Sequence, residues 1–178
     1  MTLRFDLEEI PENDMVIDVK IGADHFNQEE AEGSLSKDVV LKGSIRKWED
    51  EVFLSGEISA NWVGDCVRCL EPVNRQINTN ITAKFVPGSD SPEPGSDTEL
   101  TKSDIDVEYY IENKINLSQP IYDQIMLSLP SVNLCDANCK GLCSQCGVNL
   151  NTGECSCDEM DNIDPRLAVL KNLKNKIK

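Results

Sequence analysis

The spacing of eight cysteines constrains this chain more than any other feature of its sequence. Two form a Cys66-x-x-Cys69 pair, and the other six fall within 23 residues, at positions 135, 139, 143, 146, 155 and 157. Thiols grouped in this way are typical of a metal site, whereas isolated buried cysteines that act as small hydrophobic side chains show no such spacing. The pattern predicts that a bound metal, with zinc favoured, holds the C-terminal part of the chain together.

Four of these cysteines, all beyond residue 142, carry the strongest signal. Cys143-Ser-Gln-Cys146-Gly147 fits a zinc knuckle, in which two residues between the thiols form a tight turn. The following glycine can adopt the positive φ that this turn needs. Cys155-Ser-Cys157 places two side chains on the same side of an extended segment, so both sulfurs can reach one ion. We expect these four thiols to bind one metal ion.

The sequence leaves the remaining four cysteines open. Cys66, Cys69, Cys135 and Cys139 would complete a second four-cysteine site, which would join the first half of the chain to the cysteine-rich segment. Eight thiols divide evenly into two such sites. Against this, Leu70 stands where the first pair would need the glycine of a knuckle.

A single zinc site is the alternative, with ligands drawn from Cys139, Cys143, Cys146 and Cys157. An iron–sulfur cluster is less favoured, although four thiolates also serve it. Catalytic zinc usually keeps one ligand position open and uses histidine or carboxylate ligands. The chain has one histidine, His25, far from the cluster in sequence and expected at the surface, and it has no His-Glu-x-x-His motif. The sequence therefore predicts a structural metal and no enzyme.

The charge of the chain is strongly negative and unevenly placed. The formal net charge is −15, which argues against a large surface that neutralises phosphates. Residues 163–178 carry +4, which leaves −19 for the rest of the chain. An acidic body with a basic tail indicates a basic protein partner, or only a need for solubility. With no secretory signal and no membrane-length apolar run, we expect a cytoplasmic protein, where structural disulfides are rare.

The first half of the chain predicts a sheet. Apolar residues alternate with polar ones over four segments, at residues 15–21, 39–45, 52–62 and 73–85. A period of two with one wet face predicts antiparallel strands with one buried side, and residues 47–51 are short enough for a hairpin. Gly43 and Gly56 indicate bulges or bends at which the sheet could curl into a barrel-like form.

The second half predicts helices on either side of the cysteines. Leu117, Ile121, Ile125 and Leu129 recur every four residues, which predicts an amphipathic helix over 116–129 that packs on the core. A second helix, with a basic end, is expected from Asp164 onward. The fold class is therefore α+β. Residues 1–130 form a mainly β domain with a mobile acidic loop at 87–104, and residues 131–178 form the cysteine arm and the basic helix.

Several of these segments together resemble one family. Cys66-Val-Arg-Cys69-Leu70 resembles its early C-x-R-C-L motif, and further similarity covers residues 115–117, 120–121, 127–130, 134–135, 139–143, 146–151, 155–157 and 164–171. The chain is similar to the YceD family, the large ribosomal RNA subunit accumulation proteins, and in particular to Gram-positive members with a C-terminal cysteine cluster. Other members keep the first cysteine pair and lack the later cluster.

The resemblance implies a non-enzymatic factor that supports large ribosomal subunit biogenesis and ribosomal RNA accumulation. Because the family's gene commonly neighbours that of a small basic protein of the large subunit, it also implies binding to a basic ribosomal protein or a pre-ribosomal particle. Direct binding to naked RNA is left open. The alternative is a redox-sensing zinc-thiolate protein with holdase-type chaperone activity, whose thiols release the metal when they are oxidised.

Overall fold

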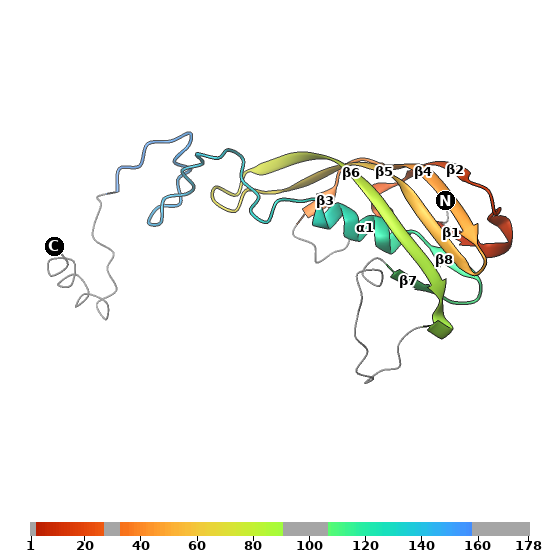
Figure 1. The fold of residues 1–178 in the computed structure, drawn as a ribbon. Helices are drawn as coiled ribbons and strands as arrows, with labels where there is room; N and C mark the ends of the chain where they lie inside the picture. The colour runs from red at the N-terminus through yellow and green to blue at the C-terminus, as the bar shows by residue number, and fades with distance from the viewer. Residues whose placement is uncertain (1–2, 27–32, 91–106, 158–178) are drawn as a thin grey trace, which may run out of the picture.

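Long antiparallel strands form the body of the protein (Figure 1). A computed structural model describes residues 3–26, 33–90 and 107–157. The main sheet has the strand order β2-β4-β5-β6-β7, with β3 also paired to β5. Its strands are β2 (Met15–Ile21), β3 (Gly33–Leu35), β4 (Val39–Trp48), β5 (Glu51–Asp65), β6 (Pro72–Pro87) and β7 (Val107–Tyr110). The predicted α+β class, with mostly antiparallel strands, is confirmed.

The glycine pair in the sheet has a different role from the one predicted. Gly43 lies directly opposite Gly56, and the β4–β5 pairing runs past both without a bulge. A methyl group on Gly56 would lie 2.6 Å from the carbonyl oxygen of Lys42, so the two strands approach too closely for any side chain. The prediction of bulges here was wrong, because a close backbone approach selects glycine in the same way.

The sheet is open, so the barrel-like sheet that the sequence suggested is not formed. Among the described residues, β2 and β7 are the two ends of the strand order and do not pair with each other. The last pairing is moreover parallel, since β7 runs alongside β6 in the same direction. A parallel pair needs a long connection. Of the predicted acidic loop at 87–104, Pro87 still belongs to β6, the next three residues form the turn η3 (Gly88–Asp90), and the rest lies outside the described residues.

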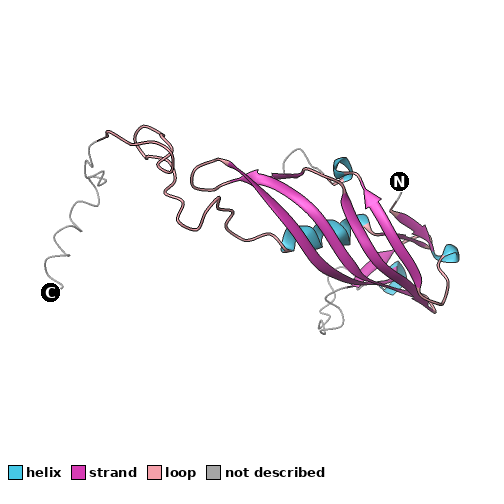
Figure 2. Cartoon of the chain, turned by 90° about the horizontal axis from the view of Figure 1, so that it is seen from above, coloured by secondary structure: helices cyan, strands magenta, loops and turns pink. Residues whose placement is uncertain are grey.

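One helix covers the buried face of the sheet (Figure 2). It is α1 (Ser118–Leu127), within the predicted range of 116–129. Ile121 and Ile125 are fully buried in the core, as their spacing predicted. Just before the helix, the side chain of Asn116 accepts a hydrogen bond from the backbone N–H of Ser118, the first helical residue, at 3.0 Å.

A small second sheet, which the sequence analysis missed, closes one end of the core. It pairs β1 (Arg4–Asp6) with β8 (Lys114–Asn116). Two short turns, η1 (Leu7–Glu9) and η2 (Ala23–His25), flank β2. His25 is exposed, as expected, and bonds through Nε2 to the hydroxyl of Ser118 at 2.8 Å.

The cysteine-bearing segment extends from the opposite end of the sheet. Figure 1 shows it leaving α1, passing the turn between β5 and β6 and continuing away from the body. The expected C-terminal basic helix lies outside the described residues. Within the ranges the structure covers, no helix is long and apolar enough to cross a membrane.

Candidate metal centre

The turn that joins β5 to β6 is a thiolate knuckle. Two hydrogen bonds close it: the N–H of Leu70 donates to the carbonyl of Cys66, and the N–H of Cys66 donates to the carbonyl of Glu71, each at 2.9 Å. Leu70 has a φ of 60°, in the left-handed region that glycine usually occupies. The turn therefore has knuckle geometry even though it lacks the glycine.

Asn133 fixes the returning chain against this knuckle. It is a buried polar residue, 8% exposed. Its side-chain amide donates to the backbone carbonyl of Asp65 at 2.9 Å, and its backbone carbonyl accepts from the N–H of Val67 at 2.9 Å. Arg75 adds a bond to the carbonyl of Leu134 at 2.8 Å. These contacts place the segment that follows α1 beside the β5–β6 turn, which brings its cysteines to the first pair.

The first set of thiols is Cys66, Cys69, Cys135 and Cys139, whose sulfurs all lie within 4.8 Å of one another. The sulfurs of Cys66 and Cys139 are 3.8 Å apart, and those of Cys69 and Cys135 are 3.5 Å apart. Cys135 is exposed and the other three are buried. The set thus links a strand turn to a segment more than sixty residues away.

The second set is Cys143, Cys146, Cys155 and Cys157, with sulfurs also within 4.8 Å. Its knuckle repeats the bonds of the first: Gly147 N–H to the Cys143 carbonyl at 2.9 Å, and Cys143 N–H to the Val148 carbonyl at 2.8 Å. The sulfur of Cys155 lies 3.3 Å from that of Cys143. None of the four is fully buried, so this set is the more accessible one.

Both sets fit a tetrahedral thiolate metal ion. A Zn–S bond of about 2.3 Å puts tetrahedral sulfurs about 3.8 Å apart, close to the distances found here. A disulfide would need sulfurs about 2.0 Å apart, and all eight cysteines are free. Backbone N–H groups also point at the sulfurs, those of Gln145 at Cys143 and of Cys157 at Cys155, each at 3.4 Å. Four thiols per set leave no ligand position for water, so such sites would be structural.

The pKa values show how each set would respond to a cation. Burial opposes ionisation of the Cys66 thiol, but backbone N–H groups, that of Arg68 foremost, lower its pKa to about 6. The N–H groups of Cys146 and Gln145 lower the pKa of Cys143 to about 6. Neighbouring thiols raise the pKa of Cys135 to about 12, and that of Cys157 likewise. Four adjacent thiolates repel one another, so a dication is needed to deprotonate all of them.

The fold brings together two groups of four, and it does not assemble the single site considered as an alternative. Cys139 lies with Cys66, Cys69 and Cys135, and not with the thiols that follow residue 142. The missing glycine after Cys69 was one argument against a site that includes Cys66 and Cys69. Leu70 removes that argument by adopting the positive φ itself.

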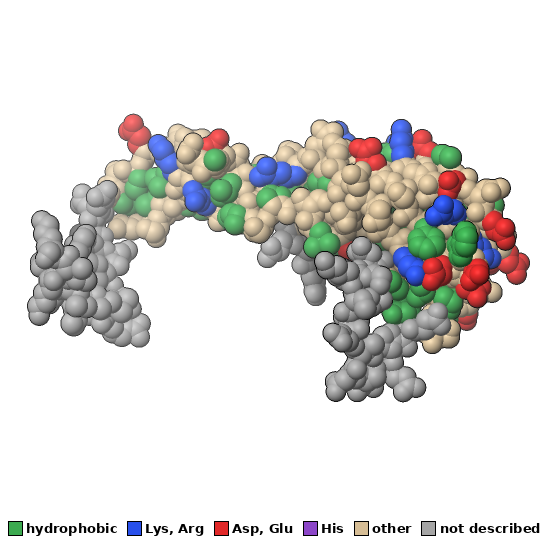
Figure 3. Space-filling view, in the orientation of Figure 1, with side chains coloured by type: hydrophobic (Ala, Val, Ile, Leu, Met, Phe, Trp, Pro, Cys, Tyr) green, Lys and Arg blue, Asp and Glu red, His purple; other side chains and the backbone are tan. Residues whose placement is uncertain are grey.

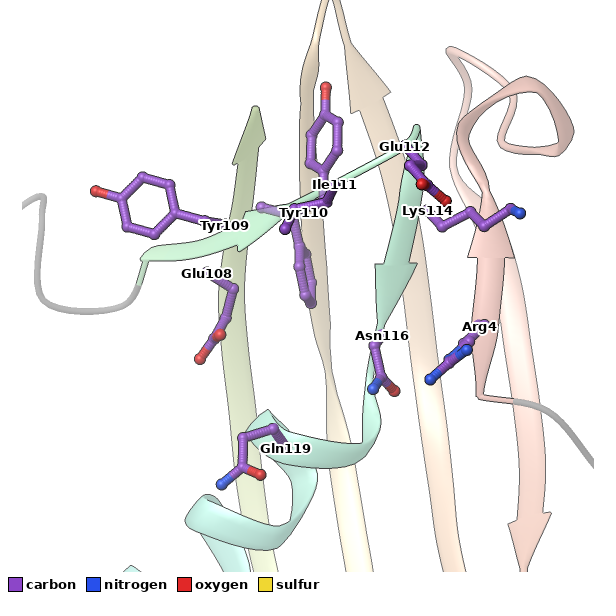
Figure 4. A pocket seen from close by; sticks show the side chains of 10 residues that line it. Arg4, Glu108, Tyr109, Tyr110, Ile111, Glu112, Lys114, Asn116 and Gln119 are labelled. Carbon is purple, nitrogen blue, oxygen red and sulfur yellow. The ribbon is translucent and has the colours of Figure 1, made fainter. Parts of the chain in front are cut away.

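A hollow of about 420 Å³ lies at the other end of the sheet, and sequence reasoning did not foresee it (Figure 4). Arg4 and Lys114 line it together with Glu108 and Glu112, so its charges offset one another. Burial, together with repulsion from Asp123, raises the pKa of Glu108. Neither His25 nor any of the eight cysteines lines this hollow.

Comparison with known proteins identifies the family. The family model described as "Large ribosomal RNA subunit accumulation protein YceD" matches residues 54–174. An uncharacterized protein of Mycobacterium tuberculosis is 37% identical over 126 residues, covering 71% of this chain and 57% of its own length. An uncharacterized protein of Mycobacterium leprae is 31% identical over 131 residues, covering 72% of this chain and 56% of its own length.

A plant protein extends the similarity beyond bacteria. The "Large ribosomal RNA subunit accumulation protein YCED homolog 1, chloroplastic" of Zea mays is 28% identical over 157 residues, covering 75% of this chain and 54% of its own length. The chain therefore spans little more than half the length of these relatives. No solved structure matches it significantly. The matched region contains both cysteine sets and α1, and the chain belongs to the YceD family of large ribosomal RNA subunit accumulation proteins.

Proposed function

We propose that the protein is a non-enzymatic factor that supports large ribosomal subunit biogenesis and ribosomal RNA accumulation by binding a basic ribosomal protein. The family match over residues 54–174 carries this proposal. The chloroplast relative bears the same description in its name. The proposal places the protein in the cytoplasm, with a protein or pre-ribosomal particle as its partner and without turnover of a substrate.

The proposal includes two structural zinc ions, one in each four-cysteine set. Cys66, Cys69, Cys135 and Cys139 would hold the first, and Cys143, Cys146, Cys155 and Cys157 the second. A structural metal supplies folding free energy to a segment that has few apolar anchors. Among the described residues of the arm, the partly buried apolar side chains that pack against the small cluster around the first set are Leu134 and Leu142.

The charge of the body suggests where a basic partner would bind. Glu8, Glu9, Glu12 and Asp14 are all exposed in the short stretch between β1 and β2. Figure 3 shows acidic side chains gathered at this end of the body, away from the cysteine segment. A surface of one sign attracts a partner of the opposite sign and repels phosphates. We therefore assign the partner contact to this acidic segment, residues 8–14.

The test compares affinity at increasing salt for the basic large-subunit protein and for naked ribosomal RNA. We expect binding to the basic protein that weakens steeply with salt, because surface charges are screened over about 8 Å at physiological ionic strength. Deleting residues 163–178 should leave this binding in place. Tight binding to naked RNA, with none to the basic protein, would refute the proposal.

A matched pair of variants tests the location of the contact. One variant neutralises the acidic segment, by Glu8→Gln, Glu9→Gln, Glu12→Gln and Asp14→Asn. The control removes the same charge from exposed acids elsewhere, by Asp24→Asn, Glu57→Gln, Asp123→Asn and Glu154→Gln. We expect the first variant to lose more than ten times as much affinity as the control. Equal losses would show that net charge, and not this segment, attracts the partner.

The exposure of the second cysteine set favours a second candidate function, a redox-sensing holdase. A hydroperoxide would take two electrons from two zinc-bound thiolates, so that one S–S bond forms, the O–O bond breaks and zinc leaves. The alkoxide and the hydroxide left by O–O cleavage each take one proton from the solvent, so that an alcohol and a water molecule are produced. Peroxide titration with a zinc-sensitive dye, followed by an assay for suppression of aggregation, tests it. Oxidised protein that fails to suppress aggregation would exclude this function.

A further inference from the structure

The loop between Cys146 and Cys155 folds back onto the segment that joins the two cysteine sets. The N–H of Leu150 donates to the carbonyl of Gly141 at 2.9 Å. Leu142 and Asn149 form an isolated antiparallel bridge. The loop that the second set closes therefore lies against the chain that leaves the first set.

One side chain of this loop reaches a sulfur of the other set. The side-chain amide of Asn151 donates from Nδ2 to the sulfur of Cys139 at 3.3 Å, while its Oδ1 accepts from the N–H of Lys140 at 2.8 Å. A backbone N–H can only donate, so the bond from Lys140 fixes which end of the amide faces the sulfur. Nδ2 also donates to the side chain of Asn149 at 2.9 Å, which holds the group in place.

This contact crosses from one set to the other. Cys139 belongs to the first set, whereas Asn151 lies between Cys146 and Cys155 of the second. Groups that hydrogen-bond to a metal ligand orient it and stabilise its charged form. A metal bound by Cys146 and Cys155 would close the loop and so reduce the entropy lost in placing Asn151.

We propose that Asn151 is a positioning residue for the metal of the first set, supplied by the loop of the second, so that the two sites bind metal cooperatively. This rests on the proposed binding of metal by both sets. Loading the second site pre-orders the amide that supports Cys139. By linkage, loading the first site tightens the second by the same factor.

The test is a double-mutant cycle on the full chain, with cobalt(II) and zinc(II) as probes. Asn151→Asp keeps the shape and can still accept from Lys140, but it presents a carboxylate oxygen to the sulfur in place of a donor. The double change Cys143→Ser and Cys146→Ser removes the second site. Affinity of the first site is read from cobalt–thiolate absorption and from zinc competition with a chelator.

We expect Asn151→Asp to weaken the first site by about 10-fold or more when the second site is intact, the range found for groups that support a metal ligand. When the second site has been removed, the same change should alter the affinity by less than about 3-fold, because the loop no longer holds the amide in place. Removing the second site alone should weaken the first by a factor similar to that of Asn151→Asp.

Controls separate this inference from the proposed metal binding. Thr152→Ala changes an exposed side chain in the same loop and should leave both affinities unchanged. Hydrogen exchange of the β-sheet shows whether each variant is folded. Wild-type protein that binds no metal would refute the metal sites themselves. If wild-type protein binds two metal ions, two outcomes would refute the coupling alone. In one, Asn151→Asp does not change the metal affinities; in the other, it changes the affinity of the first site equally with and without the second site.

Discussion

Leu70 and Gly147 occupy the same position in two turns of identical hydrogen-bond pattern. Each follows the second cysteine of a Cys-x-x-Cys pair and donates its N–H to the carbonyl of the first cysteine at 2.9 Å. Their φ angles are 60° and 72°. The left-handed region costs a residue with a side chain about 1–2 kcal/mol. The Leu70 side chain is 63% exposed, so little burial offsets that cost.

Exchanging the two residues should therefore have opposite effects. Leu70→Gly relieves the backbone strain, and Gly147→Leu introduces it where an added Cβ would meet nothing within 4 Å. Unfolded glycine has greater conformational freedom, which offsets part of this strain. We therefore expect Leu70→Gly to raise the stability of its turn by about 0.5–1 kcal/mol, and Gly147→Leu to lower the stability of its turn by a similar amount. Hydrogen exchange of the Leu70 and Gly147 amides in metal-loaded protein measures both. Changes of the same sign would contradict this account.

Metal stoichiometry should divide along the two sets. Elemental analysis of wild-type protein should give two zinc ions per chain. Cys69→Ser should remove the ion of the first set, and Cys146→Ser the ion of the second, because each loses one of four ligands. Cys143→Ser and Cys155→Ser repeat the test for the second set. Full metal retention in these last two variants would exclude the assigned ligands.

Chelation should unfold the arm and spare most of the sheet. Under the proposed metal binding the arm would depend on its metals for folding, whereas the sheet has its own core, in which Leu41, Ile45 and Ile58 are fully buried. Loss of protection should spread from the arm only into the turn between β5 and β6, which carries half of the first set. Hydrogen exchange before and after chelator treatment measures it. Global unfolding would show that the sheet, too, depends on the first site.

The carboxyl group of Glu108 should make the protein less stable at neutral pH than at acidic pH. Its pKa is raised in the folded state, first by burial and then by Asp123, so the folded state binds a proton more tightly than the unfolded one. The stability from this group is complete below the unfolded value, near 4.3, and is lost as pH rises through the folded pKa. Glu108→Gln should thus stabilise the protein at pH 7 and change little at pH 4. Urea unfolding at both pH values, with exposed Glu57→Gln as control, checks the sign.

Hydrophobic pattern was a sound guide to the main elements. The four long strands were predictable because buried side chains, such as that of Ile58 in β5, alternate with more exposed ones. The central helix was predictable because the buried side chains of Ile121 and Ile125 recur with the helical period. Strands β1, β7 and β8 have three or four residues each, too few to show a period. Their positions depend on partners far along the chain, as when β7 joins the sheet beside β6.

The second cysteine set could be predicted from local sequence, whereas the first set could be recognised only in the folded chain. The grouping of Cys143 with Cys146, Cys155 and Cys157 could be expected, because knuckle and extended-pair geometry act over a few residues. The grouping of Cys66 with Cys139 required the contacts of Asn133 and Arg75, which close a long loop. Only the fold could show that Leu70 adopts the conformation of a glycine, and that Asn151 of one loop reaches a sulfur of the other set. Local geometry follows from neighbouring residues, whereas contacts across a loop exist only once packing has closed it.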